Sequence, residues 1–231
     1  MTPWNHALSS HFGEAGPQLV MLDLDGTLID SVPDLHLAVN VMLGALGRDG
    51  VSQTQISHWV GNGLDMLLRR TLTLGDEQAA LALPQAAVVR AHSHFDPAYR
   101  ATLDRASGVF PGVDGWFAAV QVKKVLITNK SRQFTEPLIA SLGWQSRFVQ
   151  LLCGDDLAEK KPSAMPLLYA CESQGVQPAE ALMIGDSRTD IRAAKAAGIA
   201  CAAVTYGYNH GVNIRDSEPD WVVDNLLQLL S

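Results

Sequence analysis

Two aspartates separated by one residue, Asp23 and Asp25, follow an apolar run in the segment "LVMLDLDGTLIDS" (19–31). Alternate residues of a strand share one face, so both carboxylates can point the same way where the strand ends. Two close carboxylates repel unless a cation lies between them or one is protonated. Magnesium prefers oxygen ligands and is the expected cation, while Gly26 lets the backbone approach an anion closely. A simple turn or helix cap is the alternative interpretation.

Polar side chains follow apolar runs or precede helical stretches in three later segments: "LITNKS" with Thr128 and Asn129, "EKKPSAMP" with Lys161, and "MIGDSRTDIRAAKAAG" with Asp186 and Asp190. Hydroxyl, amide and backbone N–H groups can bind phosphate, a lysine can neutralise it, and two aspartates one helical turn apart can face each other. Taken singly, these residues are equally typical of an N-cap, a solvated surface or a charge on a helix dipole. Four such segments in order favour one site for a phosphate group and a metal.

Short apolar runs predict the strands that would position these residues. They occupy 19–24, 123–128, 148–153, 181–186, 199–205 and 221–223. Runs that are apolar on both faces, with helical stretches between them, are typical of a parallel sheet covered on both sides. We therefore expect an α/β fold with a Rossmann-like, doubly wound parallel sheet, which binds ligands beyond the carboxyl ends of its strands.

The region 32–107 contains helical periodicity and no convincing strand. Pro84 is expected to start, kink or split its third helical stretch, "DEQAALALPQAAVVRAHSHF". The sequence thus predicts a core domain formed by 1–31 and 108–231, with an inserted, all-helical cap domain at 32–107. The first sixteen residues carry no assignable role and are candidates for disorder.

The composition restricts the class of protein. The chain has 231 residues, 47% of them hydrophobic, and a formal net charge of −7 with no basic stripe, which argues against a nucleic-acid partner. Three widely spaced cysteines favour neither a disulfide framework nor a zinc site and fit a reducing compartment. Neither a signal peptide nor a run of membrane-spanning length occurs. We expect a cytoplasmic protein without a membrane partner, either a monomer or a homodimer.

The four segments that carry these polar residues resemble the four motifs of the haloacid dehalogenase (HAD) superfamily of phosphotransferases. They are "DLDGTLIDS", "LITNK", "KKP" and "IGDSRTDIRAAKAAG", in that order. The helical insert is similar to the first type of cap (C1) in that superfamily. "WVGNGLDMLLRRTL" (59–72) and "YNHG" (208–211) are similar to bacterial phosphoglycolate phosphatases, although Ser163-Ala164 stand where those proteins usually have His-Pro.

The resemblance implies a role for each matching residue. Asp23 would be the nucleophile that forms an aspartyl-phosphate, and Asp25 the general acid that later becomes the base. Mg²⁺ would be held by Asp23, Asp186 and the backbone carbonyl of Asp25, with Asp190 behind them. Lys161 would neutralise the nucleophile and the phosphate. The phosphoryl oxygens would be held by Gly26, Thr27, Thr128 and Asn129.

The cap would select the substrate. Phosphoglycolate carries a carboxylate beside its phosphate, and the expected cap groups for it are Gly61, Asn62, Gly63 and Arg70. The resemblance thus implies an Mg-dependent phosphomonoesterase that hydrolyses 2-phosphoglycolate, a small anionic phosphate ester. The alternatives are a phosphatase or phosphomutase of this superfamily for another small phosphate, such as a sugar phosphate, and a dehalogenase, which needs neither Asp25 nor magnesium. An inactive relative that only binds ligands is the alternative of another class.

Overall fold

Six strands form one parallel sheet in the computed structural model, which describes residues 3–231. Their order across the sheet is β5–β4–β1–β6–β7–β8. Each lies within one of the apolar runs, and they are β1 (Leu19–Leu22), β4 (Lys123–Ile127), β5 (Gln150–Leu152), β6 (Ala181–Gly185), β7 (Ala200–Val204) and β8 (Trp221–Val223). The predicted α/β class and parallel sheet are confirmed.

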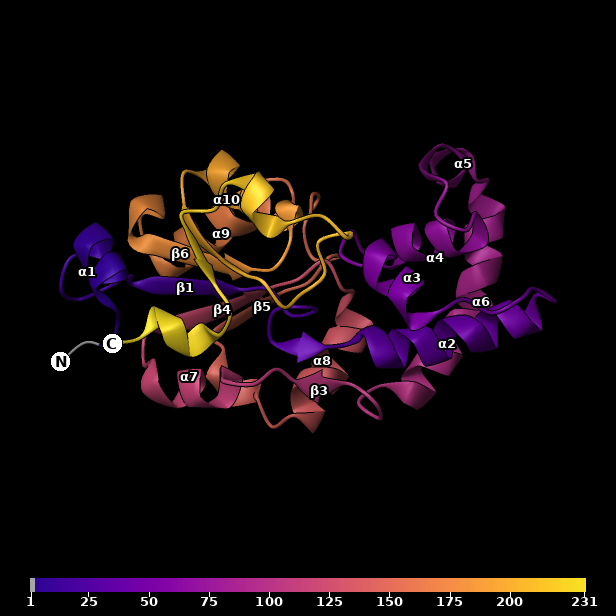
Figure 1. Cartoon of the computed structure of the whole chain (residues 1–231), viewed down its shortest axis with the longest axis horizontal. Helices are drawn as coiled ribbons and strands as arrows, with labels where there is room; N and C mark the ends of the chain where they lie inside the picture. Colours follow the sequence, from indigo (N-terminus) through magenta and orange to yellow (C-terminus); the bar gives the residue numbers. More distant parts are fainter. Residues whose placement is uncertain (1–2) are drawn as a thin grey trace.

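Helices cover both faces of this sheet because its strands are apolar on both faces. Val20 and Leu22 of β1 contact one hydrophobic cluster, whereas Leu19 and Met21 contact the other. Figure 1 shows one pair of helices on each side of the sheet. These are α7 (Val113–Ala119) with α8 (Arg132–Ser141), and α9 (Met165–Gln174) with α10 (Arg188–Ala197). Four 3₁₀ turns complete this part: η1 (Gln145–Arg147), η2 (Pro178–Glu180), η3 (Ile214–Ser217) and η4 (Leu226–Leu229).

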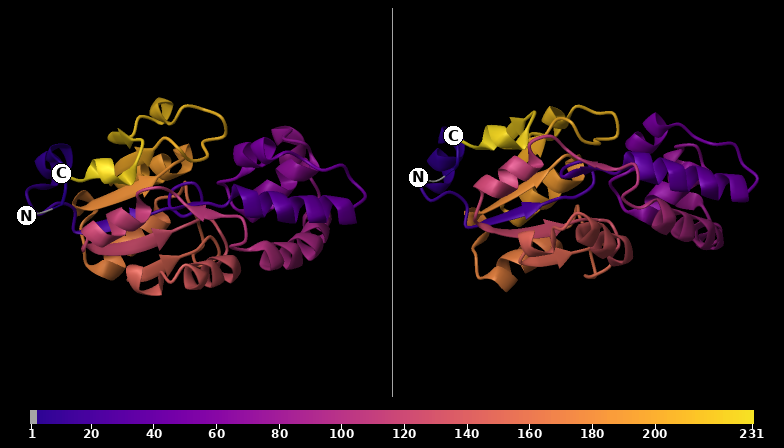
Figure 2. Two further views of the ribbon diagram at one scale, coloured as in Figure 1. Left: turned by 60° about the horizontal axis from the view of Figure 1, so that its bottom comes forward. Right: turned by 90° about the horizontal axis from the view of Figure 1, so that it is seen from below.

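Five further helices lie together beyond one end of the sheet in all three views (Figures 1 and 2). They are α2 (Val32–Ala45), α3 (Gln53–Trp59), α4 (Leu64–Leu72), α5 (Glu77–Ala82) and α6 (Gln85–Thr102). Pro84 separates α5 from α6, one of the outcomes expected of it. Most members of their shared hydrophobic cluster come from these helices, and Phe134 joins it from α8. Within residues 3–231, no helix combines the length and apolar character required to cross a membrane.

Two connections join the five helices to the sheet, and they are bound to each other. The short strands β2 (Ile29–Asp30) and β3 (Gly108–Val109) pair in an antiparallel arrangement. Asp34, at the start of α2, is fully buried and accepts hydrogen bonds from Ala106 N (2.8 Å) and Ser107 Oγ (2.5 Å). Because the Asp34 carboxylate also bonds the start of α2 to the segment before β3, the two connections form one structural unit rather than two independent linkers.

Residues 3–16 are ordered. The expectation of disorder for the first sixteen residues is therefore wrong for the part that the structure describes. The segment forms α1 (His6–Phe12), capped by the Asn5 side chain, which accepts from Leu8 N at 3.0 Å. Trp4 is 4% exposed and packs edge-on against Trp116, and its backbone forms a bridge with Leu230. Gly16 has φ +74°, and a Cβ there would lie 2.1 Å from the Trp4 ring. Aromatic burial therefore anchors this segment to the sheet layer.

We expect Trp4→Ala to lower the free energy of unfolding by about 3 to 5 kcal/mol, because truncation of a buried tryptophan leaves a cavity. Urea unfolding followed by circular dichroism measures this change. His6→Ala, at an exposed position of α1, is the matched control and should shift stability by no more than about 0.5 kcal/mol. A loss below about 1 kcal/mol for Trp4→Ala would mean that the segment is not packed in solution.

Candidate active site

The loop after β1 brings the first aspartates to the edge of the sheet. The backbone N–H of Asp23 still donates to Ile184 O of β6 (3.0 Å), so Asp23 continues the strand direction. Gly26 has φ +94°, and a Cβ there would lie 2.3 Å from Asp186 Oδ2. Thr27 Oγ1 donates to Asp186 Oδ1 at 2.9 Å. A glycine is thus required where the loop passes the carboxylate, and the threonine fixes that carboxylate.

Three buried carboxylates converge at this edge, from Asp23, Asp186 and Asp190. One oxygen from each lies within 4.8 Å of the others. Asp186 directly follows β6 and also accepts from Tyr208 N (2.5 Å). Asp190, in the first turn of α10, accepts from Ser187 N (3.1 Å) and Ser187 Oγ (2.7 Å) as part of a capping box.

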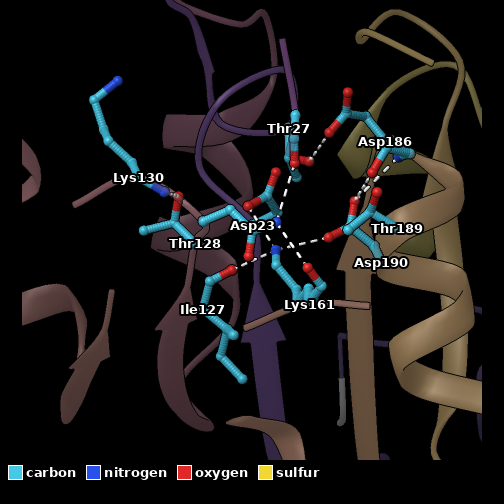
Figure 3. Close-up of polar contacts among 12 residues, drawn as sticks. Asp23, Thr27, Ile127, Thr128, Lys130, Lys161, Asp186, Thr189 and Asp190 are labelled. Atoms are coloured by element: carbon cyan, nitrogen blue, oxygen red, sulfur yellow. Dashed lines mark hydrogen bonds and ion pairs between the residues drawn. The ribbon is translucent and has the colours of Figure 1, made fainter. Parts of the chain in front are cut away.

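Lys161 lies beneath these carboxylates and is 3% exposed. Its ammonium donates to Asp23 Oδ1 (2.7 Å), Asp190 Oδ1 (2.7 Å) and Ile127 O (2.6 Å), the network drawn in Figure 3. Burial alone would lower the pKa of Lys161, but the neighbouring carboxylates of Asp190 and Asp23 outweigh burial and raise it. The lysine therefore remains charged and all three of its N–H donors are used.

One ammonium does not balance three carboxylates. Burial raises the pKa of Asp23 to about 7 against the opposing effect of Lys161, and the charges of Asp190 and Asp25 raise it further. Burial and the charges of Asp23 and Asp190 raise the pKa of Asp186 well above its usual value. A cluster of carboxylate oxygens with excess negative charge suits a hard divalent cation. These residues therefore could hold a metal ion.

The end of β4 supplies neutral polar groups. Thr128 N continues the sheet by donating to Leu152 O (3.0 Å), and Thr128 Oγ1 accepts from Lys130 N (3.2 Å). The Asn129 amide donates to Lys161 O (2.9 Å) and to Gly61 O (3.1 Å). Asn129 thus connects the sheet edge to the five-helix region. Its Oδ1 is buried and has no hydrogen-bond partner within residues 3–231.

A cavity of about 50 Å³ lies between this edge and the helices. The sheet side contributes two acids, Asp23 and Asp25, together with the four consecutive residues that follow β4, Thr128 to Ser131. The helical side is mainly apolar and contributes Leu35, Val60, Gly61, Gly63, Leu64, Leu67 and Tyr99, with Phe134 from α8. Such a volume accommodates only a small ligand.

Sequence reasoning did not single out Lys130 and Tyr99, which both line this cavity. Lys130 Nζ pairs with Asp25 Oδ1 at 2.8 Å and lies 5.0 Å from the centre of the Tyr99 ring. Burial raises the pKa of Tyr99 to about 12, although Lys130 opposes that rise. The only signal for Lys130 was its place beside Thr128 and Asn129, and Tyr99 carried no sequence signal.

The predicted cap residues divide into two groups. Gly61 and Gly63 border the cavity, whereas Asn62 and Arg70 line a separate hollow with Arg188 and Arg192. The Arg70 guanidinium is bound by Glu77 (2.8 Å), Trp59 O (2.8 Å) and Asn62 Oδ1 (2.8 Å). The structure therefore does not bring Arg70 or Asn62 to the cavity that Asp23 and Asp25 share.

Comparison with known proteins gives consistent relatives. The phosphoglycolate phosphatase of Nitrosococcus oceani is 39% identical over 219 residues, which cover 92% of this chain and 95% of that protein. The phosphoglycolate phosphatase of Pseudomonas putida is 44% identical over 217 residues, which cover 93% of this chain and 79% of that protein. A crystal structure of a protein from Haemophilus somnus, described as a predicted phosphoglycolate phosphatase, matches this fold with a TM-score of 0.85 at 33% identity. The match covers 91% of this chain and 95% of that protein.

The profile of one protein family also matches most of the chain. It covers residues 20–204, from β1 to the end of β7, and so includes all the aspartates and lysines described above. The geometry at the sheet edge, the relatives and this match agree, and the chain belongs to the haloacid dehalogenase-like hydrolase family.

Proposed function

We propose that this enzyme hydrolyses 2-phosphoglycolate to glycolate and phosphate through an aspartyl-phosphate. The chain is a phosphoric monoester hydrolase, the class to which its family and its relatives named phosphoglycolate phosphatase point. The observation that carries the finer proposal is that Asp23 and Asp25 both line one small cavity. Lys161 lies at 2.7 Å from the first of them. A nucleophile, a proton donor and a fixed cation are thus available together.

In the first half-reaction, a carboxylate oxygen of Asp23 attacks phosphorus and the ester P–O bond breaks. Asp25 donates its proton to the leaving glycolate oxygen. Lys161 holds the other Asp23 oxygen in place and offsets charge on the phosphoryl group. Thr128 and Asn129, with the backbone at Gly26 and Thr27, would bind the phosphoryl oxygens.

In the second half-reaction, water attacks the phosphorus of the aspartyl-phosphate. Asp25, now ionised, accepts a proton from that water, and the P–O bond to Asp23 breaks. Phosphate leaves, Asp23 regains its carboxylate and Asp25 its proton. The same two residues therefore serve both steps, which explains why two carboxylates are placed at adjacent positions on one face of the strand end.

Mg²⁺ fits the carboxylate cluster by its donor chemistry. Asp23, Asp186 and the backbone carbonyl of Asp25 would hold it, and Asp190 would orient Lys161 beside it. When bound, the ion supplies positive charge that draws the phosphate dianion to the carboxylates. Ser187, which donates to Asp190 twice, keeps that carboxylate turned toward the site.

We also propose that residues 32–107 act as a cap domain over the core formed by 1–31 and 108–231. The apolar helical side of the cavity would exclude water from the aspartyl-phosphate until hydrolysis. The cavity of about 50 Å³ favours a small phosphate ester over a hexose phosphate. Arg70 and Asn62 would support this domain, since Arg70 donates to Trp59 O and to Asn62 Oδ1 and so holds the turn at 59–63.

We expect the wild-type kcat/KM for 2-phosphoglycolate to exceed that for sugar phosphates and other phosphomonoesters by about 100-fold or more. Asp23→Asn should lose activity by at least about 1,000-fold with unchanged thermal stability or a small gain, because it removes the nucleophile and one buried charge. Phosphate release measures the substrate preference and the loss of activity, and thermal unfolding measures the stability. Asp114→Asn, at an exposed position of α7, is the matched control and should retain wild-type activity.

Two outcomes would contradict this proposal at different levels. A sugar phosphate as the preferred substrate would overturn the substrate while leaving the chemistry intact. Equal activity of Asp23→Asn and the wild type would overturn the aspartyl-phosphate mechanism itself.

Mg²⁺ should raise the melting temperature, and more at about pH 8 than at about pH 5.5. Because the pKa of Asp23 is raised from 3.8 to about 7, its protonated form stabilises the metal-free fold at low pH. That stabilisation is lost as the pH rises through about 7, where the metal no longer competes with the proton. Differential scanning fluorimetry measures the shift, which should be abolished or strongly reduced in Asp186→Asn. An equal shift at both pH values, or an undiminished one in Asp186→Asn, would place the metal elsewhere.

A further inference from the structure

We propose that Lys130 is the residue that recognises the carboxylate of the substrate, with the Tyr99 hydroxyl as a second donor. This inference rests on the proposed function and deepens it, because it names the groups that select an α-phosphoryloxy carboxylate, meaning a phosphate ester with a carboxylate one carbon away. Neither residue was among those expected to bind substrate, and Arg70, which was, lies outside the cavity.

Lys130 is a buried cation with one strong partner. Its side chain is only 6% exposed, and Asp25 Oδ1 at 2.8 Å is its single ion-pair partner within the described residues. A lysine ammonium has three N–H donors, and one of them faces Asp25. Its position over the Tyr99 ring holds the ammonium at the border between the sheet edge and the helices. Even with a second donor directed at the Tyr99 oxygen, this buried ammonium keeps one N–H for an anionic ligand in the cavity.

Tyr99 supplies an independent observation. Tyr99 is 1% exposed and lines the same cavity, yet its O–H has no acceptor within residues 3–231. Buried hydroxyls are rarely left without a partner, because desolvation is then uncompensated. A carboxylate oxygen bound by Lys130 would give this hydroxyl an acceptor. The orphaned donor and the buried cation thus point to the same ligand group.

Two other cations near the site are already engaged, whereas the ammonium of Lys160, an exposed residue, lies beside Gly63 at the cavity border. Lys161 uses its three donors on Asp23, Asp190 and Ile127 O. Arg70 is bound to Glu77, Trp59 O and Asn62 and lines the separate hollow. Among the described residues that line the cavity, Lys130 carries the positive charge. Figure 3 shows its side chain directed away from the Lys161 network, so the two ammonium groups can serve different parts of one substrate.

The chemistry of the substrate sets the distance between its two anionic groups. Asp25 must reach the ester oxygen that it protonates, and in 2-phosphoglycolate a single methylene separates that oxygen from the carboxylate carbon. Lys130 Nζ is 2.8 Å from the Asp25 carboxylate. A substrate whose ester oxygen contacts Asp25 would therefore have its carboxylate, one carbon away, within reach of Lys130. A longer substrate would carry its carboxylate past the ammonium.

The test is the ratio of kcat/KM for 2-phosphoglycolate to kcat/KM for 2-hydroxyethyl phosphate, in which CH₂OH replaces the carboxylate. Both substrates undergo the same phosphoryl chemistry in the same preparation, so partial misfolding or damage to Asp25 cancels in the ratio. We expect Lys130→Met to lower this ratio by about 100-fold and Tyr99→Phe by about 10-fold. Lys130→Arg, which keeps the charge, should retain most of the wild-type ratio.

Two matched variants separate local recognition from general charge. Lys195→Met removes a surface lysine of α10, whose partners are Ser217 O and Glu218, and should leave activity and ratio unchanged. Arg70→Met removes the cation that the sequence favoured and should affect both substrates alike, leaving the ratio as in the wild type. A loss of the ratio in Arg70→Met with an intact ratio in Lys130→Met would overturn the assignment.

The outcomes distinguish this inference from the proposed function. If the wild type prefers another α-phosphoryloxy carboxylate, such as 2-phospholactate, and Lys130→Met loses that preference, the inference stands and 2-phosphoglycolate falls. If the wild type prefers 2-phosphoglycolate and Lys130→Met keeps the preference, or loses both activities equally, the inference is overturned and the proposed function stands. If the wild type hydrolyses 2-phosphoglycolate and 2-hydroxyethyl phosphate with equal kcat/KM, both the inference and the proposed substrate are overturned.

Discussion

The site is organised around a local excess of negative charge that one lysine only partly balances. Like charges brought together at low dielectric repel strongly, so three buried carboxylates can share the edge only because Lys161 lies among them. Removing Lys161 would leave buried carboxylates without a counter-charge, a loss that typically costs about 3 to 5 kcal/mol, so the arrangement constrains the neighbouring loops as well as the chemistry. The Gly26 turn, the Asp190 capping box and the Tyr208 N–H all serve to hold these carboxylates.

Much of the architecture could be predicted because it depends on local patterns. The six strands are apolar on both faces, and the carboxyl ends of parallel strands meet at one edge, so Asp23, Asp186 and Lys161 were expected to converge. The split at Pro84 follows from its missing N–H. The strands β2 and β3 were not predicted, since two residues are too few to show a period. Likewise α3, at seven residues, was not singled out.

The cavity could not be predicted to the same extent, because it depends on how helices rotate against the sheet. The pairing of Lys130 with Asp25 joins positions 105 residues apart, and Tyr99 reaches them only through the packing of α6. A lysine in a loop is solvated by default, so the position of Lys130 after Asn129 does not by itself indicate a binding role. Arg70 was expected at the substrate, but Glu77 and Trp59 O hold its guanidinium in the separate hollow.

The division of labour between sheet and helices follows from where each group is anchored. Thr128 and Lys130 belong to the same short segment after β4, and the bonds from Thr128 N to Leu152 O and from Lys130 N to Thr128 Oγ1 fix that segment. Groups proposed for the phosphate and for the carboxylate would then keep their spacing whether or not the helices move. The helices contribute mainly apolar side chains and the Tyr99 hydroxyl, which would exclude water and limit the size of the substrate. Charge recognition on the rigid sheet edge, with size selection by the helices, would let the helical region open for release without disturbing the catalytic groups.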